Sequence, residues 1–481
     1  MKVLFVGGEA SPFSKTGGLG DVLGSLPKAL KGLGIDARVV LPKHKITKDK
    51  FQDQLEYLAD YRVPVGYKEE YAGIETIVYD GVTFYFIDNE YYFGYRDGLY
   101  GHYDDGERYG FFNDAVLKML PFLDWFPDVI HCNDWQSGLI PLMLEQRYKG
   151  RNIKGYENIK TMLTIHNIAY QGVFSKELMH YLNISYVNDL EFENSINFLK
   201  TGIQTADFIS TVSETYANEI LHDYFAFRMN TVLEARKNDL FGIVNGIDYD
   251  DFNPKTDKAL EYNFGLHNYL KGKSENKKAL REHFNMKQSK LPVIGMVSRL
   301  TEAKGFDIIK IIIEDLLKEG KLQMVLLGSG DPDIENYYND LKEVYPDNLG
   351  VHIGYSDKMA RQIYAGSDLF LMPSRFEPCG LAQLISLKYG TLPIVRKTGG
   401  LRDTIIAYNK FTGEGNGFGF ENFDAGDLLH AVNEAIEAFN DVPAWKKLVK
   451  NAMQEDFSWE QSAQKYIKLY DKLKGWIKWR R

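Results

Sequence analysis

The chain has 481 residues, of which 44% are hydrophobic and 26% charged, a composition typical of a globular protein and a length that suggests two or three domains. The formal net charge is −9, which excludes a whole-protein basic field for nucleic acid or an anionic membrane. The only cysteines, Cys132 and Cys379, exclude a disulfide framework and a Cys-rich metal site, and they fit a cytoplasmic protein.

Strands and helices alternate through the first half of the chain. It begins with a predicted strand at 2–6, a glycine-rich loop and a helix that starts near Leu19 and that Pro27 is expected to weaken. Asp80-Gly81 predicts the turn of a β-hairpin. The other strands are expected at 37–41, 74–79, 82–87, 129–132, 161–165 and 208–212. This alternation predicts parallel sheets built from βαβ units.

The alternation stops near residue 250 and then resumes. The polar segment 251–290 is predicted to be a linker with a little helix. Strands are then expected at 292–297, 323–327, 350–353, 369–372 and 392–395, with helices between them. We therefore expect an α/β fold of two Rossmann-like lobes. The predicted domains are 1–250 and 291–457, followed by a C-terminal helix at 458–481.

One short sequence occurs twice. Lys15-Thr16-Gly17-Gly18-Leu19 recurs as Lys397-Thr398-Gly399-Gly400-Leu401, and Asp21 and Asp403 each follow two residues after the leucine. Each copy opens a predicted helix after a strand, with one copy in each lobe. Glycine permits close approach of a ligand, and a helix N-terminus suits an anion such as a diphosphate. A Gly-Gly pair can also simply begin a helix, but two matching copies favour a ligand in a cleft between the lobes.

Two loops of the second lobe carry charged groups at the ends of predicted strands. Arg299 and Lys304 offer the guanidinium and ammonium groups that suit phosphoryl oxygens, although two loop cations are often merely solvated. Glu377 follows the strand at 369–372 and could accept hydrogen bonds from sugar hydroxyls. It could equally complement a helix dipole, and spacing alone does not separate these two roles.

Polar and aromatic residues end two strands of the first lobe. Asp134 and Trp135 follow one strand, and His166 and Asn167 follow the next. Such groups suit the hydroxyls and the apolar ring faces of sugars. His131, in contrast, is interpreted as a buried histidine with its hydrogen bonds satisfied.

Three further patterns have plainer interpretations. The dense aromatic run at 91–109 is expected to be mainly hydrophobic core. The apolar run at 308–317 is interrupted by charged residues, so no membrane span is predicted. No His-x-x-x-His or Cys-x-x-Cys pattern is present, so we predict no metal site.

Taken together, the motifs resemble those of bacterial glycogen synthases and plant starch synthases. The resemblance runs in order over essentially the whole chain. It is carried by KTGGLGD at 15–21, HCNDW at 131–135, TIHNIAYQG at 164–172, SRLTEAKG at 298–305, SRFEPCGL at 374–381 and KTGGLRD at 397–403. It implies the GT-B fold, in which two Rossmann-like lobes face each other across a cleft and a C-terminal helix crosses back to the first lobe.

The resemblance also implies an activity. The family transfers glucose from ADP-glucose to the non-reducing 4-hydroxyl of an α-1,4-glucan, such as glycogen or a malto-oligosaccharide, with retention of configuration. We therefore expect no cofactor, no metal, no nucleic-acid partner and no membrane partner. Many retaining GT-B enzymes have a second glutamate eight residues after the first. Ile385 stands at that position here, as expected for the synthase family.

Roles for individual residues follow from the matching motif positions. The implied catalytic residues are His166, through its main-chain carbonyl near the anomeric carbon, Arg299 and Lys304, which neutralise the diphosphate, and Glu377, which orients the glucose hydroxyls. The implied donor-binding residues are Lys15, Gly17, Gly18, Asp21, Tyr355 as the adenine stacker, Cys379, Gly380, Leu381, Thr398, Gly399 and Gly400. The implied sugar- or acceptor-binding residues are Tyr95, Asp134, Trp135 and Asn167.

Other functions remain open at this level. An NAD-dependent oxidoreductase also uses βαβ units, but no compact G-x-G-x-x-G follows the first strand. A UDP-glucose-dependent retaining glucosyltransferase would share most of the motifs. A non-catalytic glucan-binding scaffold is disfavoured because the cations and Glu377 are present. No enzymic nucleophile is evident, so we expect front-face attack, with the departing phosphate taking the acceptor proton.

Overall fold

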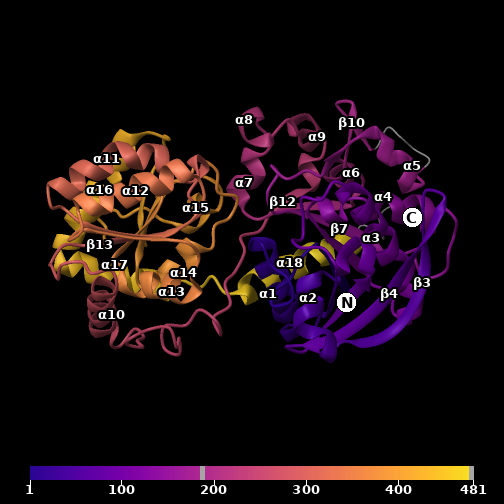
Figure 1. Cartoon of the computed structure of the whole chain (residues 1–481), viewed down its shortest axis with the longest axis horizontal. Helices are drawn as coiled ribbons and strands as arrows, with labels where there is room; N and C mark the ends of the chain where they lie inside the picture. Colours follow the sequence, from indigo (N-terminus) through magenta and orange to yellow (C-terminus); the bar gives the residue numbers. More distant parts are fainter. Residues whose placement is uncertain (185–189, 476–481) are drawn as a thin grey trace. The chain divides into compact units, whose positions relative to one another are not determined.

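The computed structural model divides the chain into two compact units (Figure 1). The first unit consists of Met1–Asn245 together with Trp459–Arg481, and the second of Gly246–Ser458. The structure describes residues 1–184 and 190–475. The last residues of the predicted C-terminal helix, 476–481, lie outside this described part.

The first unit is built on a nine-stranded sheet with the order β12-β11-β7-β6-β1-β2-β5-β4-β3. Its strands are β1 (Lys2–Val6), β2 (Asp36–Pro42), β3 (Glu56–Val65), β4 (Lys68–Tyr79), β5 (Val82–Asp88), β6 (Val129–Asn133), β7 (Lys160–Ile165), β11 (Phe208–Thr211) and β12 (Leu240–Gly242). The strands from β12 to β5 pair in parallel, whereas β5, β4 and β3 form an antiparallel meander. The hairpin predicted at Asp80-Gly81 is confirmed, since both residues have positive φ and join β4 to β5.

Helices connect the parallel strands. They are α1 (Gly18–Gly32), α2 (Lys45–Phe51), α3 (Asp105–Met119), α4 (Ile140–Met143), α5 (Met179–Leu182), α6 (Phe198–Thr205), α7 (Glu214–Glu219), α8 (Asp223–Ala226) and α9 (Asn230–Glu234). A small antiparallel sheet, in the order β8 (Val173–Phe174), β10 (Ser195–Asn197) and β9 (Glu191–Phe192), lies in the same unit. Helix α1 continues through Pro27, which is buried inside it.

The C-terminal helix α18 (Trp459–Gly475) packs against α1 within the first unit, and the two helices run side by side in Figure 1. Its apolar face, which includes Trp459, Tyr466 and Leu473, joins the same buried cluster as the side chains of β1 and β2. A polar contact fixes its position, because the Tyr470 hydroxyl lies 2.7 Å from Nδ1 of His131 at the middle of β6.

His131 is a buried histidine with both ring nitrogens engaged, as the sequence predicted. Its Nε2 lies 2.6 Å from the Thr164 hydroxyl on β7, and burial lowers the pKa of its imidazole to about 3. The neutral ring therefore links α18 to two adjacent strands of the sheet.

Tyr470→Phe should therefore destabilise the first unit. The substitution removes the hydroxyl but keeps the ring, so it leaves Nδ1 of His131 buried without this partner. An unsatisfied buried group of this kind costs about 1–3 kcal/mol of unfolding free energy. Urea unfolding of the variant and the wild type measures the difference, and an unchanged midpoint and slope would contradict the assignment.

The second unit contains a six-stranded sheet in which every neighbouring pair is parallel. The order is β15-β14-β13-β16-β17-β18, with β13 (Val293–Val297), β14 (Gln323–Gly328), β15 (Leu349–Ile353), β16 (Leu369–Met372), β17 (Leu392–Arg396) and β18 (Phe418–Phe420). Numbered within the unit, this is 3-2-1-4-5-6, the order of a Rossmann sheet. Its helices are α10 (Tyr269–His283), α11 (Phe306–Lys318), α12 (Pro332–Val344), α13 (Asp357–Gly366), α14 (Ala382–Lys388), α15 (Gly399–Thr404), α16 (Ala425–Asn440) and α17 (Val442–Gln454).

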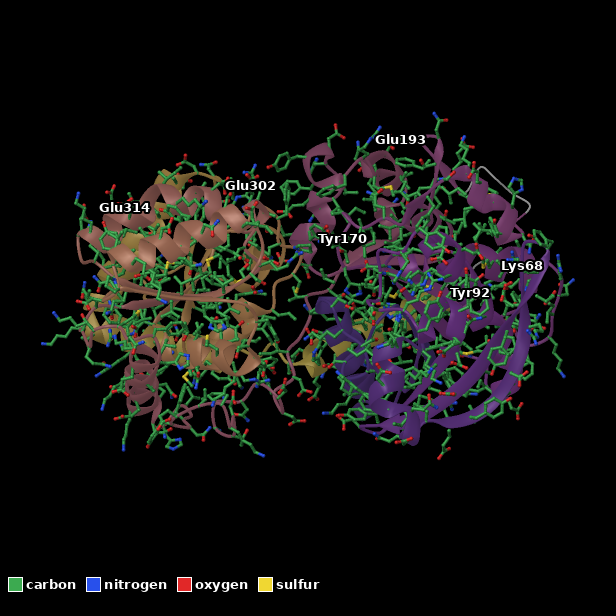
Figure 2. All side chains as sticks on the ribbon, in the orientation of Figure 1. Lys68, Tyr92, Tyr170, Glu193, Glu302 and Glu314 are labelled. Atoms are coloured by element: carbon green, nitrogen blue, oxygen red, sulfur yellow. The ribbon has the colours of Figure 1, made fainter. Side chains whose placement is uncertain are left out.

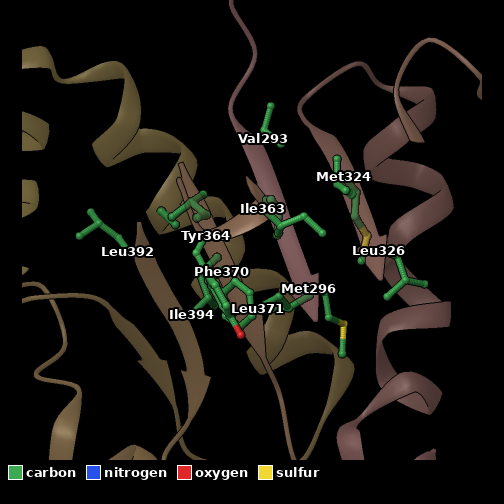
Figure 3. Close-up of a cluster of buried hydrophobic side chains, with 14 of the residues drawn as sticks. Val293, Met296, Met324, Leu326, Ile363, Tyr364, Phe370, Leu371, Leu392 and Ile394 are labelled. Carbon is green, nitrogen blue, oxygen red and sulfur yellow. The ribbon is translucent and has the colours of Figure 1, made fainter. Parts of the chain in front are cut away.

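The core of the second unit lies on the faces of this sheet. Figure 3 shows side chains of the strands, such as Met324 and Phe370, together with Ile363 of α13 in one cluster. The central strands are buried on both faces and have almost no alternating polar residues, as expected for a parallel sheet covered by helices.

The prediction of a linker at 251–290 is wrong. These residues belong to the second unit, and they include the helix α10, whose buried residues Tyr269 and Leu280 join its core. Polar contacts hold the segment before α10 as well. The Tyr389 hydroxyl donates to Asp257 at 2.5 Å, and Arg361 donates to the backbone oxygen of Asp251 at 2.8 Å. The polar composition had concealed this packing.

Within residues 1–184 and 190–475, we find no helix with the length and apolarity that crossing a bilayer would require.

Candidate functional site

The predicted site residues cluster near the point in each sheet where the order of the strands reverses. In the second unit the chain progresses outward from β13 in one direction through β14 and in the other through β16. The loops that follow β13 and β16 therefore leave the sheet next to each other, at the switch point where α/β sheets bind ligands. Arg299 and Lys304 lie on the first of these loops, and Glu377 lies on the second.

Lys304 and Glu377 meet directly. The Lys304 Nζ lies 2.6 Å from Oε2 of Glu377, and the Ser374 hydroxyl donates to the same oxygen at 2.9 Å. Glu377 is buried and Lys304 is partly exposed. The structure thus brings together a cation and a carboxylate that are 73 positions apart in the chain.

Close backbone contacts hold the two loops together. The Arg375 N–H donates to the Ala303 carbonyl at 2.9 Å. Gly305 adopts φ of +84°, and a Cβ there would lie 2.3 Å from the Pro373 carbonyl oxygen. Only glycine fits this close approach without a shift of the backbone. Lys304 is consequently fixed beside Glu377 by the path of the main chain.

Two other predicted residues of this unit are open to solvent. Arg299 is exposed and forms no ion pair with any described residue. It belongs to the same loop as Glu302, which Figure 2 labels. Tyr355, in the loop after β15, is 80% exposed. Both side chains are therefore accessible to a ligand.

The second copy of the repeated sequence is tightly packed. Helix α15 has only six residues. The Gly400 N–H donates to the carbonyl oxygens of Glu377 and Pro378, at 3.2 and 3.1 Å. A Cβ on Gly399 would lie 2.0 Å from the Glu377 oxygen, and one on Gly400 would lie 2.2 Å from the Cys379 oxygen. These glycines are required by packing. That this helix N-terminus also binds the donor, as expected from the sequence, stays a prediction.

The segment 377–381 is itself restrained. Cys379 is buried, Leu381 is partly buried, and Gly380 has φ of +74°. The Gln383 side chain donates to the carbonyls of Cys379 and Gly380 at 3.0 and 3.1 Å. Thr398, also buried, begins α15. These residues shape the backbone around Glu377.

The first unit has its own switch point, between β1 and β6. The loop after β1 carries the first copy of the repeat. Glu9, on this loop, accepts four hydrogen bonds from it: from the Thr16 N–H and hydroxyl at 2.6 Å each, and from the N–H groups of Gly17 and Gly20 at 3.1 Å each. A protein carboxylate therefore occupies the N-terminus of α1, where the sequence had predicted a diphosphate.

The two glycines at the start of α1 have open space where a side chain would begin. Among the described residues, no atom lies within 4 Å of a Cβ built on Gly18, and the nearest to one on Gly17 is a Glu9 oxygen at 3.8 Å. Neither residue has positive φ. Packing among the described residues therefore does not explain why both are glycine. Beside them the exposed Lys15 is paired with Asp21 at 2.6 Å.

Asp134 follows β6 in an unusual backbone conformation, with φ of 54° and ψ of −168°. Its Oδ1 accepts the His166 N–H at 2.7 Å, and it also accepts a backbone hydrogen bond from Asn167. Burial raises the pKa of its carboxyl to about 7, against the effect of these hydrogen bonds. Strained residues of this type are frequent at functional sites. Asp134 fixes the main chain that carries His166 and Asn167.

The His166 ring is held by a second contact. Its Nε2 lies 2.9 Å from Oδ1 of Asn133, and burial lowers the pKa of the imidazole to about 3. Because Oδ1 of Asn133 is an acceptor, we assign the proton of the neutral ring to Nε2. Asn167 accepts the Ala169 N–H at 3.0 Å, and the exposed Tyr170 follows in the same loop (Figure 2).

The aromatic residues divide into two groups. Trp135 is only 8% exposed and packs against Tyr109 and Phe174, with ring centroids at 4.9 and 5.6 Å. It contributes to the core and does not present an open face for sugar stacking. Tyr95, in contrast, is 53% exposed and lies beside Arg96. Most of the run at 91–109 points inward, as expected, but Tyr91 and Tyr103 are exposed as well.

The sequence did not identify Glu9, Ser374 or Asn133 as site residues. Each acts through hydrogen bonds to a predicted residue: Glu9 to the repeat, Ser374 to Glu377 and Asn133 to His166. A signal for Glu9 is present, since a lone acidic residue three positions after the first strand precedes a glycine-rich loop rich in N–H donors. For the other two, only the folded loops reveal the contact.

Family comparisons assign each unit separately. Residues 2–235 match the starch synthase catalytic domain, and residues 277–454 match the glycosyl transferases group 1 family. The chain is 49% identical over 478 residues to a glycogen synthase of Clostridium acetobutylicum. This match covers 98% of the present chain and 99% of that protein. It is also 46% identical over 479 residues to a glycogen synthase of Bacillus cereus, and this match covers 98% of the present chain and 100% of that protein.

Solved structures give the same result at the level of the fold. The catalytic domain of starch synthase IV from Arabidopsis thaliana, bound to ADP and acarbose, is 32% identical to this chain, with a TM-score of 0.88. The match covers 98% of this chain and 99% of that chain. Sucrose-phosphate synthase from Thermosynechococcus elongatus is 16% identical, with a TM-score of 0.60 and 98% coverage of both chains, and shows the fold alone. The predicted GT-B class is confirmed.

Proposed function

Because the chain belongs to the glycogen synthase family of glycosyltransferases, we propose that it transfers glucose from ADP-glucose to the non-reducing 4-hydroxyl of an α-1,4-glucan with retention of configuration. The observation that carries the proposal is the grouping of Arg299, Lys304 and Glu377 on adjacent loops at the switch point of the second sheet. This grouping combines charges for a diphosphate with an acceptor for sugar hydroxyls.

Departure of ADP leaves negative charge on the phosphate. Arg299, exposed and free of ion pairs with the described residues, and Lys304, fixed beside Glu377, are the groups that would stabilise it. Lys304 is held in place by this contact, and a preorganised group of this kind is worth about 3–4 kcal/mol of transition-state stabilisation. Tyr355, largely exposed in the loop after β15, is proposed to stack on the adenine.

Glu377 is better suited to orient a sugar than to attack it. Its Oε2 already accepts hydrogen bonds from Lys304 and Ser374, so the negative charge on this oxygen is neutralised. Such a carboxylate is a weak nucleophile but a well-positioned hydrogen-bond acceptor. This arrangement supports front-face attack, in which the bond from the anomeric carbon to the phosphate oxygen breaks as the acceptor oxygen bonds, and the phosphate takes the acceptor proton.

In the first unit, Asp134 is proposed to position the main chain of His166, whose carbonyl would stabilise positive charge at the anomeric carbon. The contact of Asp134 with the His166 N–H supports this assignment, because it fixes the peptide plane next to that carbonyl. Lys15, Gly17 and Gly18 would contact the donor, and the exposed Tyr95 the glucan.

A donor comparison tests the proposal. Release of nucleoside diphosphate is measured with ADP-glucose and with UDP-glucose, each with glycogen and without it. We expect glycogen-dependent release from ADP-glucose at a kcat/KM at least about tenfold above that for UDP-glucose, which is the ratio given by one or two altered base contacts. A preference for UDP-glucose would overturn the donor assignment, and no release from either would support a non-catalytic scaffold. A cytoplasmic location and independence from metals and cofactors stay predictions.

A further inference from the structure

We propose that Glu9 is a positioning residue for donor binding, which acts by fixing the loop 15–20 in the shape that presents Lys15, Gly17 and Gly18. The proposal rests on the function proposed above and adds a residue to it. Glu9 is buried, follows β1 by three positions, and belongs to none of the motifs that identified the family.

The four hydrogen bonds of Glu9 come from the loop before α1 and from the first turn of that helix. Oε2 accepts both donors of Thr16, and Oε1 accepts the N–H groups of Gly17 and Gly20. Each oxygen thus takes two bonds, so the ionised carboxylate is the form that matches this environment. Burial raises the pKa of Glu9, and its hydrogen bonds from Thr16, Gly17 and Gly20 oppose this shift.

The geometry also explains how a glycine pair can begin a helix here. Gly17 is the N-cap of α1 and has no side chain to cap it. Glu9 supplies the missing acceptor from outside the helix, since it bonds the N–H of the N-cap and the N–H of Gly20 in the first turn. The loop can therefore keep two glycines with open surroundings and still hold one conformation.

The carboxylate excludes a second anion from the same N–H groups. A diphosphate cannot accept the Gly17 and Gly20 N–H groups while Glu9 holds them. We therefore assign the contribution of this loop to donor binding to the Lys15 ammonium and to close contact at Gly17 and Gly18. Both depend on a loop whose conformation Glu9 sets.

Glu9→Gln is the sharpest test, because it keeps the size of the side chain and changes only its bonding. An amide has one acceptor oxygen, so at least two of the four donors would face an NH₂ group. We expect the KM for ADP-glucose to rise about tenfold or more, the effect of losing one or two charge-assisted hydrogen bonds that support binding. The KM for glycogen should stay within about twofold, since the loop is assigned to the donor.

Glu107→Gln is the matched control. Glu107 is a partly buried carboxylate of the same unit that accepts the Tyr92 hydroxyl at 2.6 Å, outside the site (Tyr92 is labelled in Figure 2). A purely structural role for Glu9 predicts that both variants lower the melting temperature and leave the donor KM unchanged. If Glu9→Gln does not fold, Thr16→Val, which removes one bond at an exposed position, should still raise the donor KM about threefold.

Two further measurements address the mechanism. Hydrogen–deuterium exchange of the peptide that covers 15–20 should be faster in Glu9→Gln than in the wild type, while peptides of β6 stay unchanged. The double variant Glu9→Gln, Lys15→Ala should lose less donor binding than the sum of the two single losses, because part of the Glu9 effect acts through Lys15. Full additivity, or an unchanged donor KM in Glu9→Gln, would overturn the inference. If the wild-type protein itself does not use ADP-glucose, the proposed function fails instead.

Discussion

Arg299→Ala should lower kcat by about 10²–10³-fold, the loss seen when one group that stabilises developing charge in the transition state is removed. The melting temperature should stay close to that of the wild type, because Arg299 is exposed and has no ion pair with a described residue. Steady-state kinetics with ADP-glucose and glycogen, together with thermal unfolding, separate the two effects.

Two companion variants sharpen this result. Arg299→Lys keeps the charge but loses the planar fork, and it should recover part of the activity. Lys304→Ala should also lower kcat strongly, but it removes the partner of the buried Glu377 and should cost stability as well. Lys318→Ala, at an exposed position at the end of α11, serves as the control. If Arg299→Ala keeps turnover close to that of the wild type, its assignment to the phosphate is wrong.

The strands could be predicted from the sequence because they are short apolar runs that the sheet buries on both faces. The predictions at 2–6 and 369–372 match β1 and β16 fully. The edge strand β3 was not predicted, since its first half is exposed and carries no apolar alternation. The same reasoning explains the error at 251–290, where polar residues such as Asp257 find buried partners that only the folded unit supplies.

The candidate site could be predicted only in part. Sequence motifs placed Arg299, Lys304 and Glu377 at strand ends, and the sheet order brings those ends together. The partner of a backbone N–H, however, is decided by how loops fold. This is why the two copies of the repeat were assigned one role, although Glu9 caps the first and the carbonyls of Glu377 and Pro378 close on the second.

That difference predicts opposite results when one glycine of each copy is replaced by alanine. Gly18→Ala should slightly stabilise the protein, since alanine in a helix is favoured over glycine by about 0.5–1 kcal/mol and no described atom lies within 4 Å of the new Cβ. It should nevertheless raise the KM for ADP-glucose, because the methyl group would occupy space assigned to the donor. Gly32→Ala, at the other end of the same helix with equally open surroundings, should stabilise without changing this KM.

Gly399→Ala should lower both the stability of the protein and its kcat. Its φ of +44° lies in the left-handed region, which costs an alanine about 1–2 kcal/mol, and its Cβ would lie 2.0 Å from the Glu377 carbonyl oxygen. The backbone of Glu377 must move to relieve this contact, and a displacement of about 1 Å in a catalytic group can lower kcat about 10²-fold. Melting temperature and kcat should therefore fall together.

Thermal unfolding and steady-state kinetics with ADP-glucose, measured on Gly18→Ala, Gly32→Ala and Gly399→Ala, test these predictions. If Gly18→Ala binds ADP-glucose as the wild type does, the first glycine pair has no ligand role, and packing or helix initiation must account for it. If Gly399→Ala retains its stability and turnover, the backbone of Glu377 can shift without consequence. Its rigid placement beside Lys304 would then not be what the reaction requires.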